Sequence, residues 1–218
     1  MEPIVLLGGG GHCKSVIDTI LNSQLYEIIG VIDIEKKIGQ NVFNSIKIID
    51  CDKNLYKYKA KDIKKAFVTI GSVGNPKTRI ELYEKARVIG FEIPSIVDKT
   101  AIISRNACIG EGTFIGKGVI VNAGTVIKEN CIINTGSVIE HDCCIDKFSH
   151  ISPNATLCGG VKIGCNTHIG ANSTIIQYRN IGKNVIIGAG SVVIKDIKDN
   201  VIAYGNPCRE AVKWKEPL

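Results

Sequence analysis

The 218-residue chain contains 44% apolar, 22% charged and only 6% aromatic residues, a composition typical of an ordinary folded protein rather than a disordered one. Its longest apolar runs, such as Ile4 to Leu7, fall far short of the roughly 18 residues that a transmembrane helix needs. The net charge of +6 is divided evenly between the two halves and forms no basic stripe, so we expect neither a membrane nor a nucleic acid as partner.

The N-terminus and the cysteines both indicate a cytoplasmic protein. The first residues lack the basic segment and small-residue cleavage site of a secretory signal. The nine cysteines are an odd number and include no C-x-x-C pair, so neither a disulfide framework nor a zinc ribbon is expected. Free thiols in a reducing compartment, most of them buried as small apolar side chains, are the simplest interpretation.

The first third of the chain alternates short apolar runs with segments of helical periodicity. In chain order, the sequence predicts a strand at 3–7, a glycine loop at 8–11, a helix at 12–21, strands at 28–33 and 66–70, and a helix at 76–87. Alternating strands and helices favour a small Rossmann-like parallel α/β domain, which we place at residues 1–96. Such domains bind nucleotides beyond the carboxyl ends of their strands.

The glycine loop joins the first strand to the first helix, where free backbone N–H groups and the helix dipole favour a phosphate group. The loop does not fit the dinucleotide pattern G-x-G-x-x-G, because Cys13 stands where the third glycine would be. NAD is therefore disfavoured, although Asp33 at the end of the second strand is well placed for ribose hydroxyls. A nucleotide-sugar diphosphate fits this loop, and a purely structural turn is the alternative.

From Val97 onward, a large aliphatic residue recurs at every sixth position. These anchors are Val97, Ile103, Ile109, Ile115, Val121, Ile127, Ile133, Ile139, Ile145, Ile151, Leu157, Ile163, Ile169, Ile175, Ile181, Ile187 and Val193. A period of six fits neither an α-helix nor a coiled coil, but it fits short strands joined by a turn in each hexad. We therefore predict a parallel β-helix over residues 97–198, followed by a tail at 199–218 that leaves the hexad phase.

Three histidines lie within the repeats, and one of them is a candidate general base. His150 and His168 are 18 residues apart, so they would stack if three hexads make one coil. His141 occupies an outward position between Glu140 and Asp142. An imidazole with a neighbouring carboxylate can accept a proton near neutral pH. Because alternate residues of a strand face opposite ways, the sequence leaves open which acid contacts His141.

Several segments together resemble the acetyltransferases that modify nucleotide-linked amino sugars or sialic acid. They are the loop Gly8-Gly9-Gly10-Gly11-His12, the strand end Ile70-Gly71-Ser72, the segment from Asn134 to Asp142, and the tail motif Gly205-Asn206-Pro207. The resemblance covers nearly the whole chain and is strongest to UDP-4-amino-sugar N-acetyltransferases of the UDP-N-acetylbacillosamine type. It implies a left-handed β-helix, a homotrimer, and acetyl-CoA lying in a groove between neighbouring β-helices.

The resemblance also implies roles for individual residues. His141 matches the catalytic base, Asp142 the acid that supports it, and Asn134 an active-site position. For acetyl-CoA, the matching positions are His150, Ala171 and Ala189. For the nucleotide sugar, they are Gly10, Gly11, His12, Asp33 and Ser72. Two departures, Ile34 in place of a second acid and Ser72 in place of asparagine, leave the sugar and the base of the nucleotide open.

The function expected from these features is acetyl transfer from acetyl-CoA to the amine of a UDP-4-amino-4,6-dideoxy sugar. The transfer would be direct, with His141 as general base and without a metal. O-acetylation of sialic acid or another sugar hydroxyl is one alternative, and a non-catalytic nucleotide-sugar-binding scaffold is another. A zinc hydrolyase would need three histidine ligands, of which His150 and His168 could supply only two.

Overall fold

The computed structural model describes residues 1–213, which form two compact units. The first unit contains residues 1–71 and 77–99, and the second contains residues 72–76 and the described chain from residue 100 onward. The short segment 72–76 thus belongs to the second unit, although the residues on both sides of it belong to the first.

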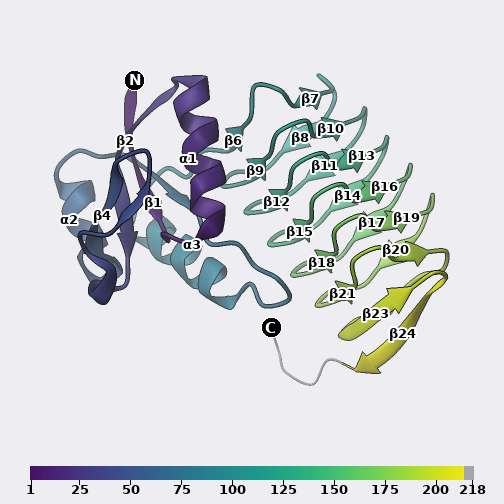
Figure 1. Cartoon of the computed structure of the whole chain (residues 1–218). Helices are drawn as coiled ribbons and strands as arrows, with labels where there is room; N and C mark the ends of the chain where they lie inside the picture. Colours follow the sequence, from purple (N-terminus) through teal and green to yellow (C-terminus); the bar gives the residue numbers. More distant parts are fainter. Residues whose placement is uncertain (214–218) are drawn as a thin grey trace. The chain divides into compact units, whose positions relative to one another are not determined.

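The first unit is a small α/β domain, with β1 near the middle of its sheet (Figure 1). In chain order it contains β1 (Glu2–Leu7), α1 (Gly11–Ser23), β2 (Tyr26–Asp33), the 3-10 turn η1 (Glu35–Lys37), β3 (Asn41–Phe43), β4 (Ile46–Cys51), the 3-10 turn η2 (Asp52–Asn54), α2 (Leu55–Ala60), β5 (Lys65–Val68), α3 (Lys77–Ile89) and β6 (Ile96–Val97). The sheet order is β3-β4-β2-β1-β5, and every pair is parallel except β3 with β4. This confirms the predicted parallel α/β fold and adds an antiparallel edge strand to it.

Burial explains why β1 lies inside this sheet. The four residues from Ile4 to Leu7 are fully buried, as expected for a parallel strand covered on both faces. On α1, the side chains of Val16, Ile17 and Ile20 are also fully buried, which gives the helix one apolar face. The helical spacing in the sequence therefore marks the side that packs on the sheet.

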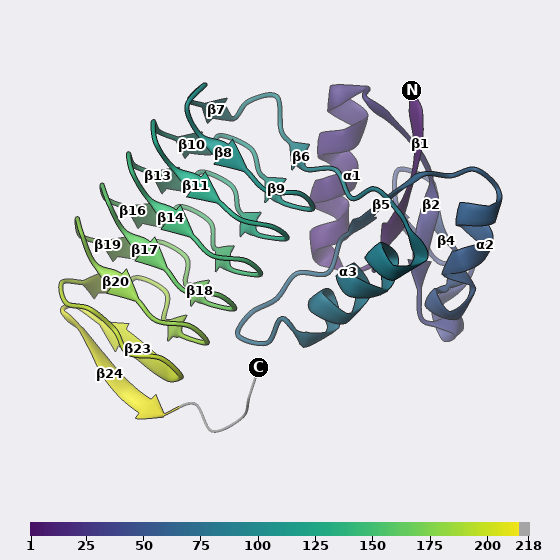
Figure 2. The same ribbon diagram turned by 180° about the vertical axis from the view of Figure 1, so that it is seen from behind.

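The second unit is a left-handed parallel β-helix of two-residue strands arranged in three sheets. The first face contains β7 (Ile102–Ile103), β10 (Ile120–Val121), β13 (Val138–Ile139), β16 (Thr156–Leu157), β19 (Thr174–Ile175) and β22 (Val192–Val193). The second face contains β8 (Cys108–Ile109), β11 (Val126–Ile127), β14 (Cys144–Ile145), β17 (Lys162–Ile163) and β20 (Asn180–Ile181). The third face contains β9 (Phe114–Ile115), β12 (Ile132–Ile133), β15 (His150–Ile151), β18 (His168–Ile169) and β21 (Ile186–Ile187). Figure 2 shows the stacked coils from behind.

The anchors of the hexads form the core of this β-helix. Val121 pairs with Ile139, 18 residues later, and Ile139 pairs with Leu157 in the same way. Three hexads therefore make one coil, which is the condition under which His150 and His168 stack. Ile133, Ile139 and Ile145 are fully buried, and the other inward anchors pack with them in one continuous apolar cluster. The unit ends in β23 (Val201–Gly205), which extends the third face, and β24 (Cys208–Lys213), which is antiparallel to it.

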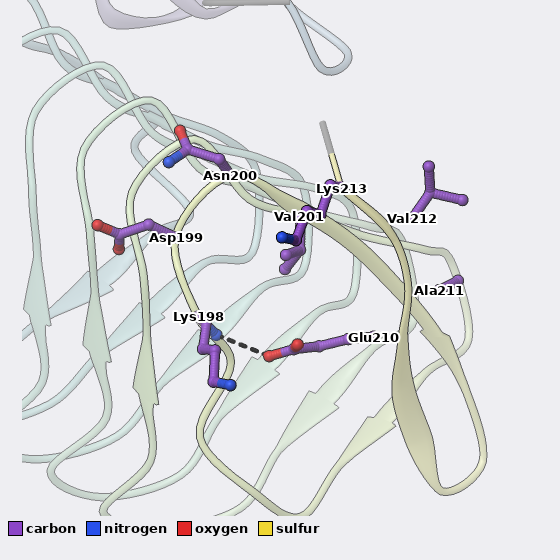
Figure 3. Close-up of a pocket in the computed structure, with 8 residues that line it drawn as sticks. All are labelled: Lys198, Asp199, Asn200, Val201, Glu210, Ala211, Val212 and Lys213. Carbon is purple, nitrogen blue, oxygen red and sulfur yellow. Dashed lines mark hydrogen bonds between the residues drawn. The ribbon is translucent and has the colours of Figure 1, made fainter. Parts of the chain in front are cut away.

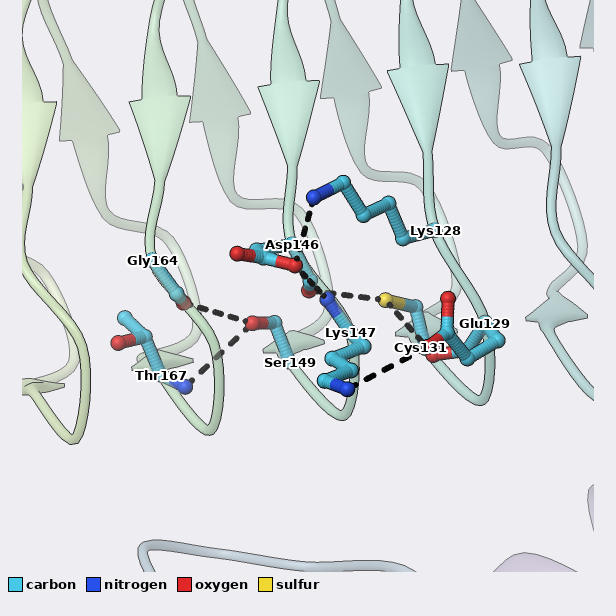
Figure 4. A network of polar contacts seen from close by, with 8 residues as sticks. All are labelled: Lys128, Glu129, Cys131, Asp146, Lys147, Ser149, Gly164 and Thr167. Atoms are coloured by element: carbon cyan, nitrogen blue, oxygen red, sulfur yellow. Dashed lines mark hydrogen bonds and ion pairs between the residues drawn. The ribbon is translucent and has the colours of Figure 1, made fainter.

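The corners between faces are closed by small polar side chains that point inward. We call the turns from the first to the second face the first corner, those from the second to the third face the second corner, and those from the third to the first face the third corner. In the second corner, Ser149 Oγ donates to the carbonyl of Gly164 at 3.0 Å, and Cys131 Sγ donates to the carbonyl of Asp146 at 3.3 Å (Figure 4). A small donor at this hexad position satisfies a buried carbonyl, which explains the recurring Ser, Thr and Cys.

Candidate active site

His141 and Asp142 meet in the first corner because the chain turns sharply between them. Asp142 has a φ of +59°, a left-handed conformation that Asp adopts more readily than most residues. This turn brings neighbouring side chains together, and His141 Nδ1 lies 2.9 Å from Asp142 Oδ2. An ionised carboxylate only accepts hydrogen bonds, so Nδ1 donates and Nε2 keeps its lone pair. Of the two acids beside His141, the structure therefore pairs Asp142 with the imidazole.

Two glycines make room for this pair. A Cβ added to Gly159, one coil further along the chain, would lie 2.5 Å from both Cε1 and Nε2 of His141. On the preceding coil, a Cβ at Gly124 would collide with a carboxylate oxygen of Asp142. Side chains at either position would displace the imidazole or its carboxylate partner. Neither glycine is among the site residues predicted from the sequence, although an 18-residue coil places Gly159 beside His141.

The pair remains accessible from solvent in the isolated chain. The side chain of His141 is 53% exposed and that of Asp142 is 71% exposed. An exposed imidazole whose Nδ1 is held by a carboxylate presents Nε2 as a hydrogen-bond acceptor and proton acceptor. The arrangement can therefore assist attack by an amine or a hydroxyl group.

The neighbouring cysteines are poor candidates for a covalent intermediate. Burial is the main cause that raises the pKa of the Cys143 thiol to about 11. Hydrogen bonds with the backbone of Val161 and Gly160 oppose this shift, and the charge of Glu140 adds to it. Burial and the same Glu140 charge also raise the pKa of Cys158. Because the thiolate is the nucleophilic form, both residues are unreactive near neutral pH. Neither thiol is therefore suited to form an acyl-cysteine intermediate.

Asn134, His150 and Ser72 come together at a different place in the second unit. His150 Nδ1 donates to the backbone carbonyl of Ser72 at 2.6 Å, and the Asn134 amide lies 3.3 Å from His150 Nε2. The rings of His150 and His168 meet edge to face at 5.0 Å, and both residues are only 7% exposed. The predicted acetyl-CoA residue His150 is thus buried, and the predicted sugar residue Ser72 contacts it through its backbone.

Ala171 and Ala189 lie on successive coils of the third corner. The N–H of Gly190 donates to the carbonyl of Ala171 at 2.8 Å, which places the two turns directly beside one another. Ala171 is half-buried and Ala189 is exposed. With small side chains on both coils, this corner leaves its backbone open to a ligand.

In the first unit, the glycine loop and Asp33 form a second polar site. The N–H of Gly9 donates to Asp33 Oδ2 at 2.7 Å, and Lys37 Nζ lies 2.9 Å from the same oxygen. Burial opposes ionisation of Asp33, but hydrogen bonds from the backbone of Ile34 and Gly9 and the Lys37 ammonium outweigh it and lower the pKa. Asp33 is therefore an ionised anchor for the loop, and its side chain is only 10% exposed.

The loop itself has the form of an anion site. Helix α1 begins at Gly11, directly after Gly10, and a Cβ added to either glycine would meet no atom within 4 Å. Gly10 and Gly11 are both exposed, so a ligand can reach the backbone at this helix start, where the helix dipole favours an anion. Beside the loop, a cavity of about 120 Å³ lies between the strand ends and α3; it is lined by Leu7, Gly8, Ile32, Asp33, Ile34, Asp52, Ile70, Thr78 and Leu82.

His12, the first residue after the glycines, lies inside the first unit. Burial, with a smaller contribution from the Arg79 charge, lowers the pKa of His12 to about 4. Arg79 is itself only 2% exposed. His12 is therefore neutral at physiological pH and contributes shape and hydrogen bonding, rather than charge, to this end of the loop.

A larger hollow of about 540 Å³ lies at the end of the β-helix unit (Figure 3). It is lined by Lys198, Asp199, Asn200, Val201, Glu210, Ala211, Val212 and Lys213. Glu210 accepts a hydrogen bond from the backbone N–H of Lys198 at 3.0 Å. None of the site residues predicted from the sequence lines this hollow.

The described residues, 1–213, contain no group of three or more His, Cys, Asp or Glu side chains arranged to hold a metal ion. None of the helices in this range has the length and apolar character needed to cross a bilayer.

Comparison with protein families divides the chain in a similar place. Residues 3–86 match the PglD N-terminal domain. Residues 106–141 match the bacterial transferase hexapeptide (six repeats), and residues 160–195 match the hexapeptide repeat of succinyl-transferase.

Solved structures similar to this chain match it over nearly its full length. The H141N mutant of perosamine N-acetyltransferase from Caulobacter crescentus, in complex with CoA and GDP-perosamine, is 31% identical, with 97% of this chain and 98% of that chain covered and a TM-score of 0.91. The acetyltransferase domain of PglB from Neisseria gonorrhoeae, in complex with acetyl coenzyme A, is 31% identical, with 96% and 99% covered and a TM-score of 0.89. WeeI from Acinetobacter baumannii, at 22% identity with 97% and 100% covered, shares the fold with a TM-score of 0.74.

Proposed function

Because this chain belongs to the hexapeptide-repeat sugar N-acetyltransferases with a PglD-type N-terminal domain, we propose that it acetylates the amine of a nucleotide-linked amino sugar. The acetyl donor is acetyl-CoA, and the acceptor we favour is a UDP-linked 4-amino-4,6-dideoxy sugar. The observation that carries this proposal is the His141–Asp142 pair, with Nδ1 held at 2.9 Å and Nε2 available as a base.

In the proposed reaction, the unprotonated amine attacks the thioester carbonyl of acetyl-CoA. A C–N bond forms, the C–S bond breaks, and His141 Nε2 accepts the proton that the amine loses. His141 then returns this proton to the departing sulfur of CoA, so the enzyme ends in its starting state. Asp142 holds the imidazole and stabilises its cationic form, and backbone N–H groups stabilise the oxyanion. A general base of this kind contributes about 10²- to 10⁴-fold to the rate.

The two units supply different parts of the substrates in this proposal. The phosphates of the nucleotide sugar bind the N–H groups of Gly10 and Gly11, beside His12, and Asp33 accepts hydrogen bonds from the nucleoside. Ser72 completes the sugar site. Asn134 is an active-site residue in contact with the acetyl-CoA site, which His150, Ala171 and Ala189 line, the last two through the open backbone described above.

We further propose that the active form is a homotrimer. The outward residues of the first face are Ile102, Ile120, Val138, Thr156, Thr174 and Val192, and none of them is charged. Packing these faces around a three-fold axis would bury the row and bring the third corner of one copy beside the first corner of the next. The nine free thiols fit a reducing compartment, so we place the reaction in the cytoplasm.

Mass spectrometry of acetyl transfer tests this function. Acetyl-CoA is supplied with UDP-linked and GDP-linked 4-amino-4,6-dideoxy sugars, and in parallel with CMP-sialic acid and free sialic acid. We expect an acetylated UDP-amino sugar that is lost with His141→Ala. Acetylated sialic acid alone would replace the proposal with O-acetylation, and turnover of the GDP-linked sugar alone would correct the nucleotide.

A further inference from the structure

Tyr178 adopts a backbone conformation that bulky residues avoid. Its φ is +58°, in the left-handed region, where most other described non-glycine residues are Asn, Asp, Ser or Gln. Within residues 1–213, the only other aromatic residue with a positive φ is Phe148, which is buried and therefore supported by packing. Tyr178 is 65% exposed, so burial does not offset the cost of its conformation. Such strain is typical of functional positions.

The ring of Tyr178 packs on the same turn as the proposed general base. A Cβ added to Gly160 would meet ring carbon Cδ1 of Tyr178 at 2.5 Å, and a Cβ added to Gly159 would meet His141. The backbone links these turns directly, since the N–H of Gly160 donates to the carbonyl of His141 at 2.8 Å and the N–H of Tyr178 donates to that of Gly159 at 2.9 Å. The imidazole therefore packs on Gly159 and the phenol ring on Gly160, two adjacent residues of one turn.

The first corner also changes in character at His141. The residue directly after each inward anchor is polar on the coils up to this point: Ser104, Asn122 and Glu140. On the following coils it is Cys158, Ile176 and Ile194. Cys158 and Ile176 are half-buried, and Ile194 is 40% exposed. Since coils are spaced about 4.8 Å apart, Cys158, Ile176, the two glycines and Tyr178 form a mainly apolar strip that runs roughly 10 Å along the β-helix from His141, with Gln177 as its one exposed amide side chain.

We propose that Tyr178 is a binding residue for the acyl donor, with its ring packed on the thioester-bearing arm of acetyl-CoA. This inference rests on the proposed function and adds a residue to it. The thioester-bearing arm of acetyl-CoA is narrow, extended and uncharged, so it fits a strip in which glycines leave room for it. Its thioester would then lie at Nε2 of His141. A sugar ring with several hydroxyl groups would find few hydrogen-bond partners among these side chains. Aromatic rings add binding energy through such packing.

Tyr178→Asn is the informative variant, because asparagine favours a positive φ and occupies equivalent corner positions at Asn154 and Asn172. It should fold at least as well as the wild type, as thermal unfolding can show. By calorimetry we expect it to bind CoA about tenfold more weakly, with a similar rise in the KM for acetyl-CoA and no change in the KM for the amino-sugar nucleotide. Tyr178→Phe should restore most of the affinity. Tyr56→Asn, at an exposed tyrosine of α2, is the matched control.

Each outcome decides between the two proposals. If Tyr178→Asn binds CoA as tightly as the wild type, or if the wild type does not bind CoA at all, the role of Tyr178 is wrong. A rise in the KM for the sugar nucleotide alone would assign Tyr178 to the acceptor instead. If the wild type binds CoA through Tyr178 but acetylates no amino sugar, the proposed function fails and the binding role stands.

Discussion

At His141, the chemistry depends on the conformation of the next residue. A strand would point Asp142 away from the imidazole, but the positive φ of Asp142 turns the carboxylate back to Nδ1. Asparagine tolerates the same conformation, so Asp142→Asn should keep the turn and remove only the charge. We expect kcat to fall about 10- to 100-fold, because the imidazolium formed during proton transfer loses its stabilising partner.

Steady-state kinetics with the amino-sugar nucleotide measure this effect. Thermal unfolding should show a midpoint close to that of the wild type, which separates a loss of charge from a loss of structure. A kcat within twofold of the wild type, with the fold intact, would remove Asp142 from the mechanism.

His12 makes stability depend on pH. In the folded chain its pKa is about 4, against 6.5 for the free side chain, mainly because of burial. Between these values the unfolded chain binds a proton that the folded chain does not, so stability falls as the pH drops from about 6.5 towards 4. The loss of folding stability reaches about 3 kcal/mol below pH 4. Above neutral pH there is no such loss, because His12 is then neutral in both the folded and the unfolded chain.

Urea unfolding of the wild type and of His12→Gln at several pH values isolates this contribution. Other titrating groups affect both proteins alike, so the difference between the two unfolding free energies reports on His12. We expect this difference to be constant above pH 7. Below pH 6.5, the unfolding free energy of the wild type should fall relative to that of His12→Gln. Parallel curves down to pH 4 would contradict a buried, neutral His12.

At the scale of the coil, the inward donors of the corners have a measurable effect on stability. Ser149 is fully buried, and its hydroxyl also receives a hydrogen bond from the N–H of Thr167 at 3.4 Å. Ser149→Ala would leave the carbonyl of Gly164 without its donor, at a cost of about 1–3 kcal/mol. Urea unfolding at fixed protein concentration measures this loss of unfolding free energy. Ser149→Cys should lose less, because Cys131 has the same role one coil earlier; an equal loss for both variants would rule out the hydrogen bond as the cause.

The packing of Gly159 against the neighbouring coil also positions the general base, His141. Gly159 does not have a positive φ, so alanine is compatible with its backbone, and the clash falls on the exposed ring of His141. We expect Gly159→Ala to fold normally and to lower kcat about 10- to 100-fold by displacing the imidazole from Asp142. Combining it with His141→Ala should add no further loss, since both changes act on the same group. Additive losses would show that Gly159 acts elsewhere.

The hexads made the β-helix predictable because a single strict period fixes which residue points inward on every coil. The first unit was less predictable. The sequence pattern predicts no element over residues 41–60, which contain β3, β4 and α2, because charged side chains interrupt their apolar pattern. The sequence pattern also does not predict long-range contacts. The hydrogen bond between His150 and Ser72 joins positions 78 residues apart, and no local spacing indicates it.

For the whole molecule, the arrangement of apolar residues on the outside of the β-helix indicates how copies associate. On the third face, the outward residues Phe114 and Ile132 are already only 2% exposed within one chain. The second face carries Lys162 and Asn180, which suit contact with water. The uncharged row on the first face is the one that a second copy would cover, and closed three-fold symmetry would cover it on every chain.

A homotrimer would have a mass of about 70 kDa, three times the 23.5 kDa chain, and we expect light scattering coupled to size-exclusion chromatography to measure this mass. Ile120→Glu should convert the homotrimer to single chains, because three carboxylates would be forced together in an apolar interface. Val126→Glu is the matched control, since Val126 occupies the same hexad position on the second face and is already 40% exposed.

If the acetyl-CoA groove is completed by a neighbouring copy, Ile120→Glu should also abolish acetyl transfer while Val126→Glu retains it. Equal masses for the two variants would show that copies do not meet through the first face.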